Sequence, residues 1–192
     1  MVTNSSPPRV PPMRDEELDS SARAVVSEFP PGSVVNITRT LLWHPDVLSA
    51  YRTFGTKLRR GILPARDLEL VILRIAWRCR AETEWGGHVH AALESGLSER
   101  DIARIPEGPD ALGWSAFDSV LLAAVDELHD VSSLSDETWA RLADVYDRRQ
   151  MIEFVLVVGN YHMLSYVMNA FRIEREPGWP GFPPAYGAKG TA

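Results

Sequence analysis

The amino-acid sequence predicts an all-α fold. Apolar residues recur every three or four positions through most of the chain, which is the period of a helix that buries one face. Proline, glycine and serine stand between these segments, where helices usually begin and end. The β-branched runs at 71–72 and 155–158 have local strand character. However, no turn-separated partner with alternating polarity accompanies them, so the helical interpretation accounts best for the pattern.

In the first half of the chain, proline and glycine mark the ends of the predicted helices. Pro45 opens a helix at its first turn and Gly61 ends it, while Pro64 precedes the most apolar segment of the chain. Gly96 stands where a helix C-cap glycine belongs. Ser98 has acidic residues directly behind it, as an N-cap does. The predicted helices cover residues 15–28, 33–43, 45–60, 65–80, 84–94 and 98–105.

The second half repeats the helical plan. Ser135, followed by two acidic residues, is a plausible helix cap. The apolar segment after Arg66-Asp67-Leu68-Glu69 and the one after Arg148 have similar openings, with Glu69 and Glu153 at corresponding places. This echo indicates two related helical halves. The predicted helices cover residues 115–128, 135–146 and 151–172.

The two ends of the chain differ from the helical part. Residues 1–14 are rich in proline and predict a flexible N-terminal arm, and residues 15–176 predict a single helical domain. Residues 177–192 form a tail of proline, glycine and aromatic residues. Aromatic side chains in such a tail indicate docking on a surface of the same subunit or of a neighbour. They are Trp179, Phe182 and Tyr186.

Composition excludes several classes of protein. The net charge of −6 over 192 residues offers no basic surface for nucleic acid. Apolar runs such as Phe154–Val158 are too short to span a bilayer, and the N-terminus lacks the pattern of a secretory signal. The single cysteine leaves no disulfide framework. We therefore expect a cytoplasmic protein with neither a membrane nor a nucleic acid as partner.

One segment carries the chemistry. Glu84 and His88 are four residues apart, so on a helix they face the same way. Glu69 lies among aliphatic residues of the preceding helix, where a carboxylate needs a partner or must take up a proton. A turn near 81–83 would fold the two helices together and bring the three side chains into one coupled acid/base group. This group predicts a small proton-transfer site.

Each of these residues also has a structural explanation. A Glu–His pair at this spacing is common on helix surfaces, and Glu69 could simply satisfy a helix dipole. His162 is either a core histidine or a second wall of the pocket, and Cys79 reads as a small buried apolar residue. No further ligand stands at metal spacing near Glu84 and His88, so we predict no metal there. The remaining histidines read as caps, helix-end cations or solvent-facing residues: His44, His90 and His129.

Several motifs resemble the carboxymuconolactone decarboxylase family. They are Asn36-Ile37-x-Arg39-Thr40, His44-Pro45, Arg66 to Arg74, Glu82-Thr83-Glu84-Trp85-Gly86-Gly87-His88, Ala92-x-x-x-Gly96-Leu97-Ser98 and Val158 to His162. The resemblance covers about residues 15–175, and the Glu-Trp-x-x-His segment is its most specific part. It implies an alkylhydroperoxidase-D-like helical fold and a homo-oligomer, a trimer or a hexamer.

The resemblance also bounds the chemistry. In the peroxidase branch of the superfamily a Cys-x-x-Cys pair precedes the histidine, and its positions fall on Ala81 and Glu84 here. Both thiols are absent, so disulfide-based peroxide reduction does not carry over. The decarboxylase branch needs no thiol. It implies cofactor-free proton transfer or decarboxylation on a small cyclic substrate with a carbonyl or lactone group.

These arguments give three hypotheses. The first is a cofactor-independent lyase or isomerase in which His88 is the acid/base and Glu84 or Glu69 sets its charge. The second is a non-catalytic member that serves ligand binding or assembly, and the third is a peroxidase-related antioxidant protein. For the enzyme we expect a small-molecule substrate, held by four residues whose roles follow from residue type alone: Trp85, Arg39, Arg74 and His162.

Overall fold

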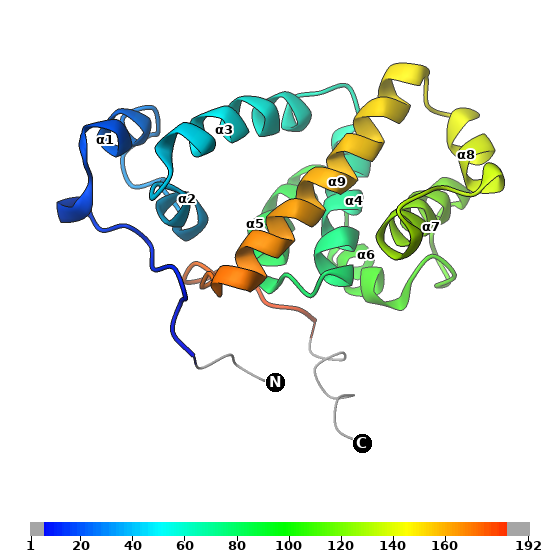
Figure 1. Ribbon diagram of the computed structural model, residues 1–192. Coiled ribbons are helices and arrows are strands. Elements are labelled where there is room, and N and C mark those ends of the chain that lie inside the picture. Colours follow the sequence, from blue (N-terminus) through cyan, green and yellow to red (C-terminus); the bar gives the residue numbers. More distant parts are fainter. Residues whose placement is uncertain (1–5, 184–192) are drawn as a thin grey trace.

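The computed structural model describes residues 6–183, and its regular secondary structure in that range consists of helices, with no strands (Figure 1). The predicted all-α class is confirmed. Two short 3-10 helices, η1 (Asp15–Glu17) and η2 (Ile105–Glu107), accompany the α-helices. The α-helices are α1 (Ser20–Val26), α2 (Asn36–Leu41), α3 (Pro45–Arg59), α4 (Ala65–Arg78), α5 (Glu82–Glu94), α6 (Glu99–Arg104), α7 (Ala116–Val131), α8 (Asp136–Ala143) and α9 (Arg148–Phe171).

The helix expected over 15–28 is broken near its start. Asp19 adopts an extended backbone conformation, and its side chain accepts a hydrogen bond of 2.8 Å from the backbone N–H of Ala22. An aspartate that caps a helix in this way fixes the first turn just after itself. The preceding acidic residues therefore form the separate turn η1, and α1 begins only at Ser20.

Helix α4 is the centre of the main core. Its residues from Leu68 to Ala76 are all buried, including Glu69 and Arg74. Helices α5, α7 and α9 pack around it. A helix that buries residues on nearly all sides, as α4 does, needs such a complete cover. In Figure 1 the long helix α9 runs across this centre, with α1–α3 on one side of it and α7 and α8 on the other.

A tight turn folds α5 back on α4, as the sequence predicts. Arg80 takes the left-handed conformation with φ of 54°. The N–H of Ala81 then bonds to the carbonyl of Ala76 at 2.8 Å, which closes the last turn of α4 in a Schellman arrangement. This turn brings the middle of α5 against the first half of α4.

A ladder of arginine–aspartate pairs joins α4 to α7. Each pair has the same sequence separation of 52 residues, so the two helices run parallel. Only the middle arginine, Arg74, is fully enclosed; it also donates to the carbonyl of Ile105 at 2.6 Å. The pairs are Arg66–Asp118, Arg74–Asp126 and Arg78–Asp130.

Helix α9 is longer than its apolar runs suggested. It has 24 residues and is apolar enough, by length and composition, to cross a membrane, which the sequence analysis did not expect. Half of its most apolar window is buried inside the protein, as in the core helix of a globular fold. The helix continues through polar positions such as Asn160 and His162, which is why no long apolar run announces it.

The two ends of the described chain lie against the helical domain. The N–H of Arg9 bonds to the carbonyl of Phe171, and Met13 is buried in a small second core with residues of α1, α2 and α3. Near the C-terminus, Phe182 packs edge-on against Trp77 at 4.9 Å and Trp85 at 5.4 Å. Tyr186, the third aromatic residue of the predicted docking tail, lies outside the described residues.

Candidate active site

The structure brings Glu69, Glu84 and His88 together. The Nδ1 atom of His88 lies 2.7 Å from Oε2 of Glu69, and its Nε2 atom lies 3.2 Å from Oε1 of Glu84. All three residues are buried. Glu69 comes from α4 and the other two from α5, so the turn between these helices creates the group. Both ring nitrogens of the histidine thus face a carboxylate.

The two carboxylates control the charge of the histidine. Burial by itself acts to lower the pKa of His88, because it penalises the charged ring. Hydrogen bonds to Glu69 and Glu84 outweigh burial and raise the pKa of His88 to about 9. The ring is therefore an imidazolium at neutral pH and donates from both nitrogens. One oxygen of the group is left over: Oε2 of Glu84 is buried and has no hydrogen-bond partner within residues 6–183.

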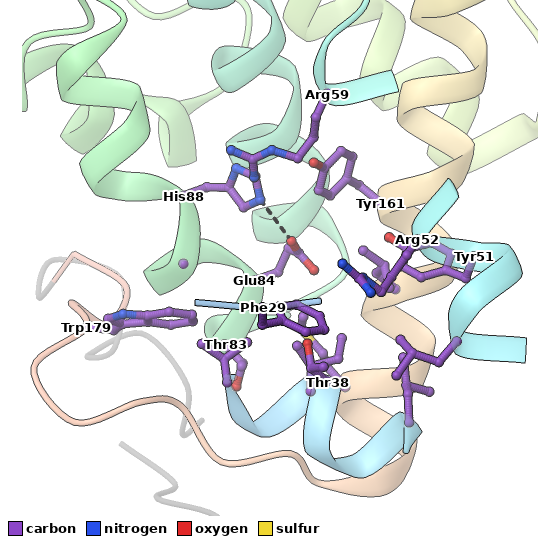
Figure 2. Close-up of a pocket in the computed structure, with 17 residues that line it drawn as sticks. Phe29, Thr38, Tyr51, Arg52, Arg59, Thr83, Glu84, His88, Tyr161 and Trp179 are labelled. Atoms are coloured by element: carbon purple, nitrogen blue, oxygen red, sulfur yellow. Dashed lines mark ion pairs between the residues drawn. The ribbon is translucent and has the colours of Figure 1, made fainter. Parts of the chain in front are cut away.

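A pocket of about 250 Å³ opens beside this group, between the main core and the small N-terminal core. Glu84 and His88 line it (Figure 2). Glu69 contacts the His88 ring but is not among the lining residues. Its other walls are largely apolar, and Tyr161 packs edge-on against the His88 ring at 5.1 Å. The pocket is smaller than the roughly 300–1,000 Å³ of sites for drug-sized ligands, which indicates a small ligand.

Two arginines of α3 line the same pocket. Arg52 is occupied: it pairs with Glu28 at 2.6 Å and stacks on Phe29 at 3.9 Å. Arg59 has no ion pair or hydrogen bond within residues 6–183. Figure 2 shows Arg59 beside His88 and Tyr161, on the other side of Glu84 from Trp179. A free guanidinium at the edge of an otherwise apolar pocket is suited to bind a ligand carboxylate.

The C-terminal segment closes one side of the pocket, and two glycines of α5 make room for it. A Cβ atom on Gly87 would lie 2.9 Å from the Trp179 ring, and one on Gly86 would lie 2.7 Å from the carbonyl oxygen of Pro180. The backbone N–H of Phe182 also donates to Glu82 at 3.2 Å. Glycine lowers the stability of a helix interior by about 1 kcal/mol relative to alanine. The close approach of the C-terminal segment explains why α5 nevertheless has two glycines at this position.

The structure places the four predicted substrate-binding residues away from the pocket walls. Arg74 is held by Asp126 in the α4–α7 ladder, and Arg39 pairs with Asp15 at 2.9 Å. Trp85 is buried in the core against Trp77. His162 lies on another side of α9 from Tyr161, next to His129. A residue's type shows that it can bind an anion, but its helix face decides what it contacts.

Sequence reasoning did not identify the pocket-lining residues of α3, nor those that precede α3 in the chain. Tyr51 and Arg59 lie two helical turns apart on α3 and turn toward the pocket. Burial raises the pKa of Tyr51 to about 12, although its hydrogen bond to Asn160 acts in the opposite direction, so the phenol keeps its proton. The one available signal was Gly55, whose missing Cβ leaves room for the Tyr51 ring.

Comparisons with known proteins support the fold and the family. Residues 45–126 match the model of the carboxymuconolactone decarboxylase family, which confirms the predicted resemblance to that family. The match contains α3, α4 and α5 and therefore the acid/base group, whereas α1, α2 and α9 lie outside it. No curated protein sequence is similar enough to count as a relative.

Solved structures show the same fold at low identity. An uncharacterized peroxidase-related protein from Silicibacter sp. TM1040 has a TM-score of 0.77 at 14% identity, over 93% of this chain and 98% of that one. A putative antioxidant defence protein AhpD from Agrobacterium tumefaciens has a TM-score of 0.67 at 17% identity, over 71% and 94%. The debrominase Bmp8, solved with 2,3,4-tribromopyrrole, has a TM-score of 0.67 at 17% identity, over 88% and 91%.

Proposed function

We propose that this protein is a cofactor-independent enzyme that moves a proton on a small carbonyl- or lactone-bearing acid. The observation that supports it best is the unpartnered Oε2 of Glu84, buried at the wall of a pocket. A buried carboxylate oxygen without a partner costs free energy unless a ligand uses it. The other oxygen of Glu84 is held by His88, so the free oxygen has a fixed position.

Our proposal gives Glu84 the acid/base role that sequence reasoning assigned to His88. Both nitrogens of His88 are already engaged, so its ring positions Glu84 and lowers the cost of burying its charge. In an isomerisation, Oε2 of Glu84 takes a proton from the carbon next to the carbonyl, and the C–H electron pair moves to the carbonyl oxygen as an enolate. Return of the proton to another carbon completes the reaction.

Decarboxylation of a lactone acid fits the same group. The bond to the carboxylate carbon breaks, CO₂ leaves, and the electron pair spreads into the unsaturated lactone as a dienolate. The His88–Glu84 pair then delivers a proton to carbon and takes up a new proton from solvent. Arg59 supplies a positive charge at the pocket for the substrate carboxylate or the enolate oxygen.

Hydrogen exchange tests this proposal without knowledge of the natural substrate. Small γ-lactone and β-keto carboxylic acids are incubated with the protein in D₂O, and NMR follows deuterium uptake at carbon and loss of CO₂. We expect catalysis with at least one of these acids, and a loss of about 10²–10⁴-fold in Glu84→Gln. Absence of exchange and of CO₂ loss across the series, or full activity of Glu84→Gln, would contradict the proposal.

The chain provides a matched control on the same helix. His90 and Glu94 form a second Glu–His pair at 3.2 Å, but both side chains are largely exposed, at 84% and 70%. His90→Gln should therefore keep full activity, while His88→Gln should lose it. Equal losses in the two variants would indicate a general effect on α5 rather than a role for the buried group.

Binding or assembly without turnover is the second candidate function. An exposed apolar strip on α9 favours assembly with a second copy of the chain, as the family resemblance implies. Light scattering of the purified protein and of Leu156→Glu tests this, since a charge within the strip should shift the protein toward monomer. The strip consists of Ile152, Val155, Leu156, Met163 and Tyr166.

The antioxidant hypothesis has less support at this pocket. Cys79 does not line the pocket, and the sequence has no second thiol to form a disulfide with it. A peroxide-consumption assay with a dithiol reductant tests the hypothesis directly, and we expect no turnover.

A further inference from the structure

A second group of reactive side chains lies outside the pocket. Cys79 stands at the end of α4, His129 in the last turn of α7 and His162 in the middle of α9. One ligand atom from each lies within 4.8 Å of the other two. The Sγ atom of Cys79 is 3.7 Å from Nδ1 of His129, and the two imidazole rings are 5.0 Å apart. The sequence had indicated a small buried apolar residue for Cys79, a helix-end cation for His129, and a core or pocket-wall histidine for His162.

These side chains are available as ligands. Within residues 6–183 neither His129 nor His162 pairs with a carboxylate, although both are half-buried. Two imidazole rings and a thiol meet here from three different helices. A cation placed between them would engage all three.

We propose that Cys79, His129 and His162 form a site for a zinc ion. Thiolate and imidazole are the preferred ligands of Zn²⁺, with bonds of about 2.3 and 2.0–2.1 Å. A tetrahedral ion with these bond lengths separates sulfur and nitrogen ligands by about 3.6 Å. The observed separation of 3.7 Å between Sγ and Nδ1 therefore already matches a metal-bound pair. Small side-chain rotations would bring in the third ligand and leave a fourth position for water.

The surroundings hold two of the ligands in place. Asn169 donates its side-chain N–H to the carbonyl of Cys79 at 2.8 Å, and the Tyr166 ring lies 4.6 Å from that of His162. Ordered neighbours of this kind orient the ligands of a metal site. Since the ligands come from three helices of the main core, bound zinc would cross-link α4, α7 and α9. The site is separate from the pocket, whose walls include none of the three residues.

The single cysteine makes the test specific. Protein stripped with a chelator is titrated with Co²⁺, and absorption is followed for thiolate-to-cobalt charge transfer and tetrahedral ligand-field bands. We expect one equivalent per chain, displaced by Zn²⁺. Any thiolate band must come from Cys79, because the chain has only one cysteine. Alkylation of that thiol should also slow at least tenfold when zinc is added, and this measurement needs no variant.

Three variants complete the experiment. Cys79→Ser and His162→Asn should lose the cobalt spectrum, and zinc should raise the melting temperature of the wild type but not of these variants. His90→Asn, which changes an exposed histidine elsewhere, should behave as wild type. The proposal is overturned if the wild type takes up no Co²⁺ or Zn²⁺ and its thiol stays unprotected. Tight uptake that persists in Cys79→Ser would overturn it as well.

Discussion

The Nδ1 atom of His88 lies 2.7 Å from Oε2 of Glu69, a residue that precedes it by 19 positions. The contact crosses the α4–α5 hairpin and is buried on both sides. Glu69 is thus a positioning residue behind the pocket: it fixes the ring that in turn holds Glu84. The charge of the site depends on this chain of contacts.

The first prediction concerns pH. His88 has a pKa of about 9 in the folded protein, compared with about 6.5 in an unfolded chain. Between these values the folded state binds the proton more strongly, so this group's stabilisation is complete below pH 6.5 and is lost as the pH rises through 9. NMR titration of the His88 ring should show a midpoint well above 6.5. A midpoint at or below 6.5 would contradict the assigned charge.

The second prediction concerns Glu69→Gln. The amide keeps the size of the side chain but removes a charge, so the pKa of His88 should fall. The pH at which activity declines should then shift to a lower value, while KM changes little. A simple structural role for Glu69 would lower stability without moving the pH profile. Kinetics across pH, compared with the unfolding midpoint in urea, distinguish the two.

The third prediction concerns Arg59. If its free guanidinium binds the substrate carboxylate, Arg59→Ala should raise KM by about 10- to 100-fold, as expected for a charged hydrogen bond of about 1.5–3 kcal/mol. The neighbouring Arg60 does not line this pocket, so Arg60→Ala is the matched control. Equal KM values for both variants would remove Arg59 from the proposed site.

The fourth prediction concerns the closing segment. Gly87→Ala improves helix propensity by about 1 kcal/mol, but it pushes a methyl group against Trp179 at a cost of about 1–3 kcal/mol. We therefore expect a net loss of up to about 2 kcal/mol. In a Trp179→Ala background the clash disappears, and the same change should become stabilising. This double-mutant cycle is measured by urea unfolding. Additive effects would show that Trp179 does not rest on Gly87.

Much of the fold was predictable because it depends on local signals. Pro45 and Gly61 bound α3 as expected, and the boundaries of α4 and α5 fall within two residues of the prediction. The pair Glu84–His88 was predictable because both residues share one helix face. Glu69 could be added because only a tight turn separates the two helices.

The remaining assignments needed contacts between distant segments. Arg74 is suited to bind a substrate by type, but the partner that it meets, Asp126, lies 52 residues away. His162 and Tyr161 are adjacent in sequence, yet one faces His129 and the other faces His88. The local sequence does not predict which of two neighbouring helix faces will line a pocket.

The sequence by itself determined the helical class, the family resemblance and the acid/base pair on α5, because helical period, capping residues, short motifs and spacing along one helix are local properties. Only the tertiary structure decided that Glu84 keeps a free oxygen, that Arg59 lines the same pocket, and that Cys79 meets two histidines. Each of these depends on how separate helices pack, and packing is settled by the burial of whole apolar faces rather than by any one residue.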